Sequence, residues 1–148
     1  MAQREAGQGY GMRLNKTTEY AIRVLLYLVQ HGERTYSTRS LYLALDIPYK
    51  YLGRLMKTLT DAGFLIARRG KTGGYRLAAG VAQINLHRII EELEGLEDFE
   101  RCILGLPECS ETQPCVMHQR WSRERERIKR MFATVSLIDL AARSDTRS

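Results

Sequence analysis

The sequence predicts a mainly α-helical protein with a small β-wing, in which a winged helix-turn-helix is followed by a long C-terminal dimerisation helix. Three observations predict this fold class. Apolar residues recur at helical spacing in four segments of the chain. A short apolar strand, a glycine-rich turn and a return strand follow the third of these segments. A long, densely charged segment with helical periodicity lies near the C-terminus.

The chain begins with a polar, glycine-rich stretch that precedes the first helix. We expect residues 1–11 to be a disordered or expression-derived extension that takes no part in the fold. Residues 15–18 offer side chains that cap a helix N-terminus, and Gly32 is a suitable end point. The apolar stripe of this helix follows the spacing i, i+3, i+4 and i+7, at Ala21, Val24, Leu25 and Leu28.

The next two helices form the expected helix-turn-helix. Ser37 or Thr38 is expected to cap a short helix. After a break, the third helix is expected over about residues 48–62, with proline tolerated in its first turn and Gly63 as a stop signal. The apolar positions of the two helices are Leu41, Leu45, Leu52, Leu55, Met56 and Leu59.

A β-hairpin is expected directly after this helix. Residues 64–68 form a short apolar strand, residues 69–74 a tight basic turn and residues 75–77 the return strand. The pair at residues 73–74, two glycines, supplies the positive φ that hairpin turns need. Three helices followed by a hairpin predict a winged helix-turn-helix DNA-binding domain at residues 12–80.

A linking helix and a loop are expected after the wing. Residues 81–97 contain the helix, with Asn85 as its cap. Its apolar stripe consists of Leu86, Ile89, Ile90 and Leu93. Residues 98–114 then form a cysteine-containing loop that we expect to bind a metal cluster.

A long helix and a last short helix are expected at residues 115–142, with Pro114 near the start. The apolar positions of the long segment are Met117, Trp121, Ile128, Phe132 and Val135. This face is too narrow for a core helix, which favours packing against a partner subunit. Ser136 and Asp139 have the spacing of a capping box for the short helix. Residues 143–148 are expected to be a disordered tail.

The positive charge of the chain is concentrated in its first half. The net charge is +6, yet residues 12–78 carry 12 Lys and Arg against 4 Asp and Glu, while residues 79–148 carry 10 against 12. A basic head joined to a near-neutral tail favours a polyanion such as DNA as partner. No apolar run approaches the roughly 18 residues needed to cross a bilayer. Because the start of the chain also lacks a signal-peptide core, we expect a cytoplasmic protein with no membrane partner.

Basic and tyrosine side chains form a candidate surface for double-stranded DNA. In a helix-turn-helix the second helix enters the major groove, where arginine and lysine contact guanine and tyrosine hydroxyls suit phosphates. Any one of these residues could instead belong to an ordinary solvent-exposed basic surface without a DNA-binding role. The candidates on this helix are Tyr49, Lys50, Tyr51, Arg54 and Lys57. Arg69 and Lys71 at the wing tip suit the minor groove, and Thr38 and Arg39 suit the DNA backbone.

All three cysteines lie close together, in the pattern C-x6-C-x5-C-x2-H formed by Cys102, Cys109, Cys115 and His118. Thiolates bind soft metals and iron–sulfur clusters, and a loop with glycine and proline lets the sulfurs converge. Three thiolates leave one coordination position to another residue, for which His118 is the nearest candidate. We expect an iron–sulfur cluster of the 2Fe–2S or 4Fe–4S type. The alternatives are a structural zinc ion in this loop and a cluster-free repressor that responds to thiol redox state or to a small molecule.

Catalytic residues are not expected. The chain has no C-x-x-C motif, no nucleotide-binding loop and no nucleophile–base pair that we can assign to a pocket. We therefore expect a regulator and not an enzyme.

Four motifs resemble the Rrf-type family of bacterial winged-helix regulators, to which IscR, NsrR and RirA belong. The motifs are MRLNKTTEYAIRVL at 12–25, IPYKYLGRLM at 47–56, GFL at 63–65 and RGKTGGYRL at 69–77. The similarity extends over about residues 12–141. The resemblance implies a homodimer that is joined through the long C-terminal helix and binds a near-palindromic operator.

The resemblance also implies roles for single residues. Tyr20 occupies the position of a DNA contact in some relatives, and Arg69 matches a minor-groove arginine of the wing. Arg54 stands where IscR has a glutamine, so the resemblance does not imply that this protein recognises the operator sequence of IscR. The C-x2-H spacing that includes His118 is similar to that of IscR. Glu19, from the partner subunit, is the alternative fourth ligand, because it occupies the place of a carboxylate ligand in NsrR.

Overall fold

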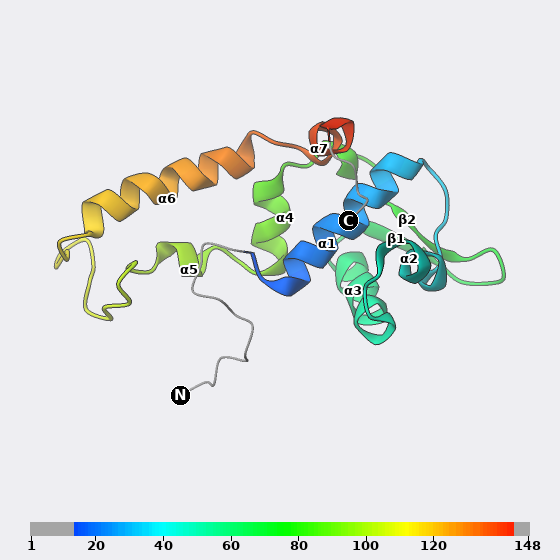
Figure 1. Ribbon diagram of the computed structural model, residues 1–148, viewed down its shortest axis with the longest axis horizontal. Helices are drawn as coiled ribbons and strands as arrows, with labels where there is room; N and C mark the ends of the chain where they lie inside the picture. Colours follow the sequence, from blue (N-terminus) through cyan, green and yellow to red (C-terminus); the bar gives the residue numbers. More distant parts are fainter. Residues whose placement is uncertain (1–13, 144–148) are drawn as a thin grey trace.

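A computed structural model describes residues 14–143, which form helices and one two-stranded antiparallel sheet (Figure 1). The expected fold class is confirmed. Residues 1–11, the expected extension, lie outside the described residues. Of the expected tail at 143–148, only Arg143 is described. The elements are α1 (Lys16–His31), α2 (Thr38–Leu45), α3 (Tyr49–Asp61), β1 (Leu65–Arg68), β2 (Gly74–Leu77), the 3₁₀ turn η1 (Val81–Gln83), α4 (Leu86–Leu93), α5 (Glu97–Glu100), α6 (His118–Ala133) and α7 (Leu137–Arg143).

Side-chain caps begin α1 and α2. The Asn15 side chain accepts the Thr18 amide at 2.8 Å at the start of α1. Ser37 accepts the Ser40 amide at 3.0 Å, so Ser37 rather than Thr38 caps α2. Each cap satisfies an amide that has no partner within its own helix. The third helix begins one residue later than expected, with Pro48 at its N-cap.

The core lies between α1 and the helix-turn-helix. Every apolar position expected for α1, α2 and α3 is buried. Phe64 and Leu65 extend this core into the wing, and Ile89 and Leu137 extend it into the C-terminal half. Because α1 contacts α2, α3, α4, β2 and α7, it is the central element of the fold.

The wing is joined to the loop before α2. Strands β1 and β2 pair with Leu65 opposite Leu77, and a further bridge pairs Tyr36 with Tyr75. The bridge has two hydrogen bonds, from the Tyr36 amide to the Tyr75 carbonyl at 2.7 Å and from the Tyr75 amide to the Tyr36 carbonyl at 2.8 Å. Strand β2 is therefore hydrogen-bonded on both edges.

The glycines of the wing differ in part from the expectation. Of the expected pair Gly73–Gly74, only Gly74 has a positive φ (144°), and the other positive φ of the turn is at Gly70 (110°). Gly73 is needed for another reason, because a Cβ there would lie 2.2 Å from the Arg68 carbonyl oxygen. The turn closes through a hydrogen bond of 3.0 Å from the Gly73 amide to the Gly70 carbonyl.

The boundaries of the cysteine loop were predicted wrongly at both ends. Residues 97–100 form the short helix α5, and α6 begins at His118 instead of residue 115. Residues 115–117 form a turn, which the His118 amide closes by donating to the Cys115 carbonyl at 3.1 Å. The loop therefore covers residues 101–117.

Helix α6 projects away from the core, and the chain returns from it to α7, which packs against α1 (Figure 1). The expected capping box is present: Asp139 donates its amide to Ser136 Oγ at 3.2 Å, and the Ser136 amide donates to the Asp139 carboxylate at 3.1 Å. The cysteine loop and the wing lie at opposite ends of the molecule. Among residues 14–143, no helix has the length and apolar character of a membrane span.

Candidate metal centre and DNA-binding surface

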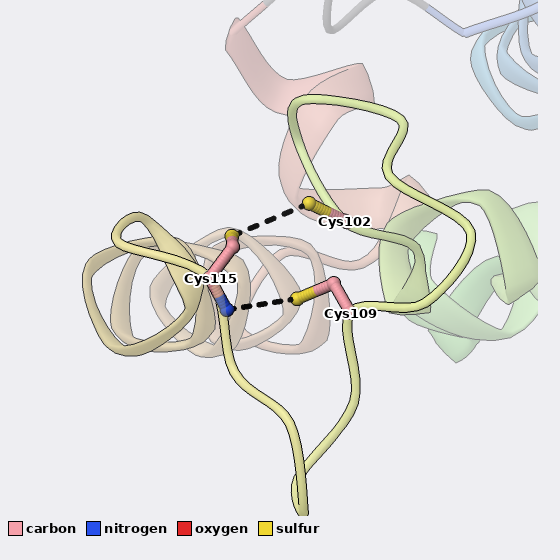
Figure 2. A group of neighbouring side chains, drawn as sticks. All are labelled: Cys102, Cys109 and Cys115. Carbon is pink, nitrogen blue, oxygen red and sulfur yellow. Dashed lines mark hydrogen bonds between the residues drawn. The ribbon is translucent and has the colours of Figure 1, made fainter.

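The three cysteine side chains converge at the tip of the projecting arm (Figure 2). Their sulfur atoms all lie within 4.8 Å of one another, and Sγ of Cys102 is 3.6 Å from Sγ of Cys115. Cys102 follows α5, Cys109 lies in the middle of the loop, and Cys115 precedes the first turn of α6. The structure thus brings together the three sulfurs that the spacing predicted.

His118 lies beside this cluster. Its Nδ1 is 3.4 Å from Sγ of Cys109, and its Nε2 is 3.8 Å from a carboxylate oxygen of Glu111. A carboxylate beside one ring nitrogen leaves the other nitrogen free to act as an acceptor or a metal ligand. The fourth donor expected from the sequence is therefore next to the sulfurs, as the first residue of α6.

Backbone hydrogen bonds shape the loop. The Gly105 amide donates to the Cys102 carbonyl at 2.9 Å, and the Cys109 amide donates to the Leu106 carbonyl at 3.2 Å. Gly105 has φ of 73°, which only glycine adopts without strain. The Cys115 amide points at Sγ of Cys109, 3.4 Å away. Two tight turns and one N–H···S contact hold the sulfurs near one another.

The surroundings shift the pKa values of two thiols in opposite directions. Backbone hydrogen bonds from Leu106 and Leu104, and weaker ones from the other two thiols, lower the pKa of Cys102 to about 7, against the opposing effect of desolvation. For Cys109, the Cys115 amide favours the thiolate, but desolvation and the neighbouring sulfurs of Cys115 and Cys102 outweigh it and raise the pKa. A low thiol pKa favours metal binding, because the thiolate is the ligand.

These donors fit a thiolate-bound metal. Two thiolates on one tetrahedral ion with bonds of about 2.3 Å are about 3.8 Å apart, close to the 3.6 Å between Cys102 and Cys115. A cavity of about 300 Å³ adjoins the cluster and is lined by Cys102, Cys109, His118, Trp121 and Arg125 among others. The site has both soft donors and adjacent space.

Glu19 is not part of this cluster within one chain. It lies in the first turn of α1, where its carboxylate is 3.5 Å from the Lys16 ammonium. The resemblance implied that Glu19 would reach the cysteines from a partner subunit, so its position within one chain leaves that alternative as a prediction.

Helix α3 presents four of the candidate DNA contacts to solvent. Tyr49, Lys50, Arg54 and Lys57 are exposed, and Lys57 also pairs with Asp61 at 2.9 Å. Among the other candidates, Arg39, Arg69 and Lys71 are exposed and Thr38 is half-buried. The structure therefore leaves the heads of these basic side chains accessible.

Tyr51 and Tyr20 are held against each other. Their rings meet edge to face, with centroids 5.2 Å apart. The Tyr51 hydroxyl is hydrogen-bonded to Thr17, and both tyrosines are half-buried. Lys16 and Arg23 lie over the Tyr20 ring, 5.1 and 5.7 Å from its centroid. Tyr51 thus has a packing role between α1 and α3 that the sequence pattern did not reveal.

Two residues beside the metal site were missed in the sequence. Trp121 and Arg125 line the cavity, although Trp121 was predicted only as an apolar dimer residue. The sequence spacing could have revealed them. Trp121 lies three residues and Arg125 seven residues after His118, and helix residues at these spacings share a face.

Comparison with known proteins gives consistent results. The family profile described as Rrf2, iron-dependent transcriptional regulator, matches residues 14–143. The chain is 30% identical over 132 residues to the HTH-type transcriptional regulator NsrR of Geobacillus kaustophilus, covering 87% of this chain and 89% of the relative.

Solved structures of similar fold cover nearly all of the chain. CymR (YrzC), the global cysteine regulator of B. subtilis, superposes with a TM-score of 0.74 at 26% identity over 91% of this chain and 100% of that chain. IscR of T. potens superposes with a TM-score of 0.71 at 25% identity, over 91% of this chain and 90% of that chain. The family match covers residues 14–143, so this chain belongs to the Rrf2 family of transcriptional regulators.

Proposed function

We propose that this protein is a homodimeric DNA-binding regulator whose operator affinity is modulated by an iron–sulfur cluster held by Cys102, Cys109 and Cys115, with His118 as fourth ligand. One observation carries the proposal: three sulfurs and an imidazole nitrogen gather at the point where α6 begins. Because His118 is both a candidate ligand and the first residue of that helix, the metal site and α6 share one residue.

The space beside the donors supports a cluster. Three cysteines and one histidine are also the ligands of a structural zinc ion, but a cluster needs more room than one ion does, and a cavity of about 300 Å³ adjoins the sulfurs. When bound, an iron–sulfur cluster supplies a centre whose charge and integrity respond to oxidants and to iron supply. The three cysteines hold it, and His118 and Glu111 adjust the electronic properties of the fourth position.

The long helix supports a homodimer. None of its 16 residues is buried within the chain, and Met131 is 55% exposed. Ile128 and Phe132 are only half-buried. A helix of this length with an uncovered apolar stripe is stabilised by packing against a second helix, and a second copy of α6 offers the same stripe.

The basic head supports binding to a near-palindromic operator. Two copies of α3 related by two-fold symmetry would enter successive major grooves, with Arg54 and Lys50 toward the bases. Arg69 of each wing would enter the adjacent minor groove. The Tyr20–Tyr51 pair orients the first turn of α3, so we assign Tyr51 a positioning role beside the expected DNA contact.

The Cys102–Cys115 pair favours a second candidate function, a cluster-free thiol switch. With sulfurs 3.6 Å apart, the two thiols would lose two electrons and two protons to hydrogen peroxide, which is reduced to two molecules of water, and would join as a disulfide. Such a bond would tie the end of α5 to the start of α6.

Anaerobic purification tests the proposal. We expect a brown protein with visible absorbance and with iron and acid-labile sulfide, and we expect Cys109→Ala to abolish all three signals. Glu108→Gln, an exposed change in the same loop, is the matched control and should retain them. A colourless protein with one zinc per chain would establish the zinc alternative, and a colourless, metal-free protein with a reversible Cys102–Cys115 disulfide would establish the thiol switch.

A further inference from the structure

The chain that leads into Cys102 is held by α6 at several points. The indole Nε1 of Trp121 donates a hydrogen bond of 2.8 Å to the carbonyl of Arg101, the residue directly before Cys102. Trp121 lies three residues after His118 on the same helix. One turn of α6 therefore contacts the metal site through His118 and the backbone beside Cys102 through Trp121.

One turn further along, Arg125 caps α5. Its Nη1 donates to the carbonyls of Phe99 and Glu100, at 3.4 and 3.3 Å. Carbonyls in the last turn of a helix have no partner within that helix, so the guanidinium satisfies groups that would otherwise need water. The Arg125 side chain is 13% exposed and its Nε is 3.7 Å from a Glu100 carboxylate oxygen. The Arg125 side chain is therefore largely shielded from solvent, whereas the Glu100 side chain is 52% exposed.

Lys129 completes the row. Its ammonium pairs with the Glu100 carboxylate and is also 3.7 Å from Glu126. The hydrogen bond from Lys129 lowers the pKa of Glu100, with Arg125 adding to the effect. Trp121, Arg125 and Lys129 are spaced four residues apart, which places them on one face of α6. We call these three residues the α6 clamp.

The loop after Cys102 is held by short-range hydrogen bonds, from the Gly105 amide to the Cys102 carbonyl and from the Cys109 amide to the Leu106 carbonyl. Residues 103–108 are all exposed, including the apolar side chains of Ile103, Leu104 and Leu106. Chain that buries no apolar surface is not fixed to the rest of the fold by packing, and keeping it in place costs conformational entropy. The local bonds shape the loop, whereas the α6 clamp attaches the residues before Cys102 to another helix.

We propose that the α6 clamp positions Cys102 in the donor set, so that the affinity of the three thiolates for a metal depends on contacts that touch no sulfur. The proposal rests on the proposed function in one respect, that the cysteine cluster binds a metal. Coupling between sites is reciprocal. If the clamp favours metal binding, an occupied site stabilises the contact between α5 and α6 by the same factor, and occupancy reaches the dimer helix through Trp121 and Arg125.

The test is a titration of the full-length, reduced, metal-free protein with Co²⁺ under anaerobic conditions. Thiolate-to-cobalt charge-transfer bands report both the dissociation constant and the number of bound cysteines. We would compare wild type with Trp121→Phe, which removes the indole N–H but retains an aromatic ring, and with Arg125→Gln and Arg125→Lys. Arg127→Gln is the matched control, because Arg127 is 70% exposed and pairs with Glu124 within α6.

We expect Trp121→Phe and Arg125→Gln each to raise the dissociation constant by about two- to tenfold, the usual net effect of losing one or two hydrogen bonds. Their spectra should move toward that of Cys102→Ser, and Arg125→Lys should recover part of the affinity. Circular dichroism checks the fold of each variant; if Arg125→Gln is unfolded, the milder Trp121→Phe decides.

Unchanged affinity in both clamp variants, or an equal loss in Arg127→Gln, would overturn the clamp while leaving the metal-binding proposal intact. A wild-type protein without charge-transfer bands would instead remove the metal site, and with it the clamp's role. DNA binding by the wing and α3 would stand in either case.

Discussion

Nδ1 of His118 lies 3.4 Å from Sγ of Cys109, and His118 is also the first residue of α6. The loop's central cysteine therefore contacts the N-terminus of the helix that we propose for dimerisation. If this imidazole binds a metal as proposed, a change in its coordination would act directly on the first turn of that helix.

The identity of the fourth ligand gives a first prediction. His118→Ala should lower cluster or metal affinity by at least about 10- to 100-fold, because removing a ligand should cost no less than removing a group that only orients one. Glu19→Gln should leave affinity unchanged, because Glu19 pairs with Lys16 within its own chain. Metal titration measures the affinity of each variant, and electron paramagnetic resonance of the reduced protein shows whether the ligands of the cluster have changed. An altered spectrum in Glu19→Gln alone would show that the partner subunit supplies the ligand.

The wing gives a second prediction. Arg69→Ala should weaken binding to an operator selected from random duplex DNA by about 1–3 kcal/mol, with the largest loss at A·T-rich flanks. Fluorescence anisotropy at several salt concentrations measures the affinity. Arg127→Ala, on the projecting arm, is the control and should bind as wild type does. Equal losses at all flanking sequences would contradict minor-groove insertion.

Two glycines should respond in opposite directions to alanine. A Cβ at Gly73 would lie 2.2 Å from the Arg68 carbonyl oxygen, so Gly73→Ala should destabilise the protein by about 1–3 kcal/mol, as overpacking does. Gly53 lies within α3 with nothing within 4 Å of its Cβ position. Gly53→Ala should therefore stabilise the protein by about 0.5–1 kcal/mol. Urea unfolding measures both, and a stabilising Gly73→Ala would refute the close approach.

The capping box at α7 makes stability depend on pH. The Ser136 amide and side chain lower the pKa of Asp139 below its ordinary value of 3.8. A carboxyl group with a depressed pKa contributes its full stability above the unfolded value and loses it as pH falls through the folded value. Asp139→Asn should thus be less stable than wild type at pH 6, and the difference in unfolding free energy should vanish as pH falls below 3.8 toward the folded pKa. A difference that persists there would exclude the carboxylate as its source.

Local chemistry explains what the sequence predicted well. The caps at Asn15, Ser37 and Asn85 and the capping box at Ser136 each involve residues three positions apart, so a short window contains the whole interaction. Apolar spacing likewise placed the core of α1 and α3. The convergence of the three cysteines followed from their closeness in sequence and from the turns at Gly105 and beyond.

What the sequence did not predict depends on contacts between distant segments. The start of α6 is set by a turn at Cys115, not by Pro114 alone, and α5 is capped by Arg125 from another helix. The Tyr51 hydroxyl is engaged by Thr17 across the fold. No periodicity reports these contacts, because each partner also fits an ordinary surface or helical position.

The Tyr36–Tyr75 bridge affects how the contacts of the proposed dimer would be spaced along its operator. Strand β2 is bonded to β1 on one edge and to the residue before the α2 cap on the other, so the base of the wing is tied to the helix-turn-helix. This tie restrains the distance between the major-groove and minor-groove contacts of one subunit. In the proposed dimer, the spacing between the contacts of the two subunits along the DNA is then easier to change than the spacing within one subunit. We expect a signal at the cysteines to change the spacing between subunits, while the bases that each subunit recognises stay the same.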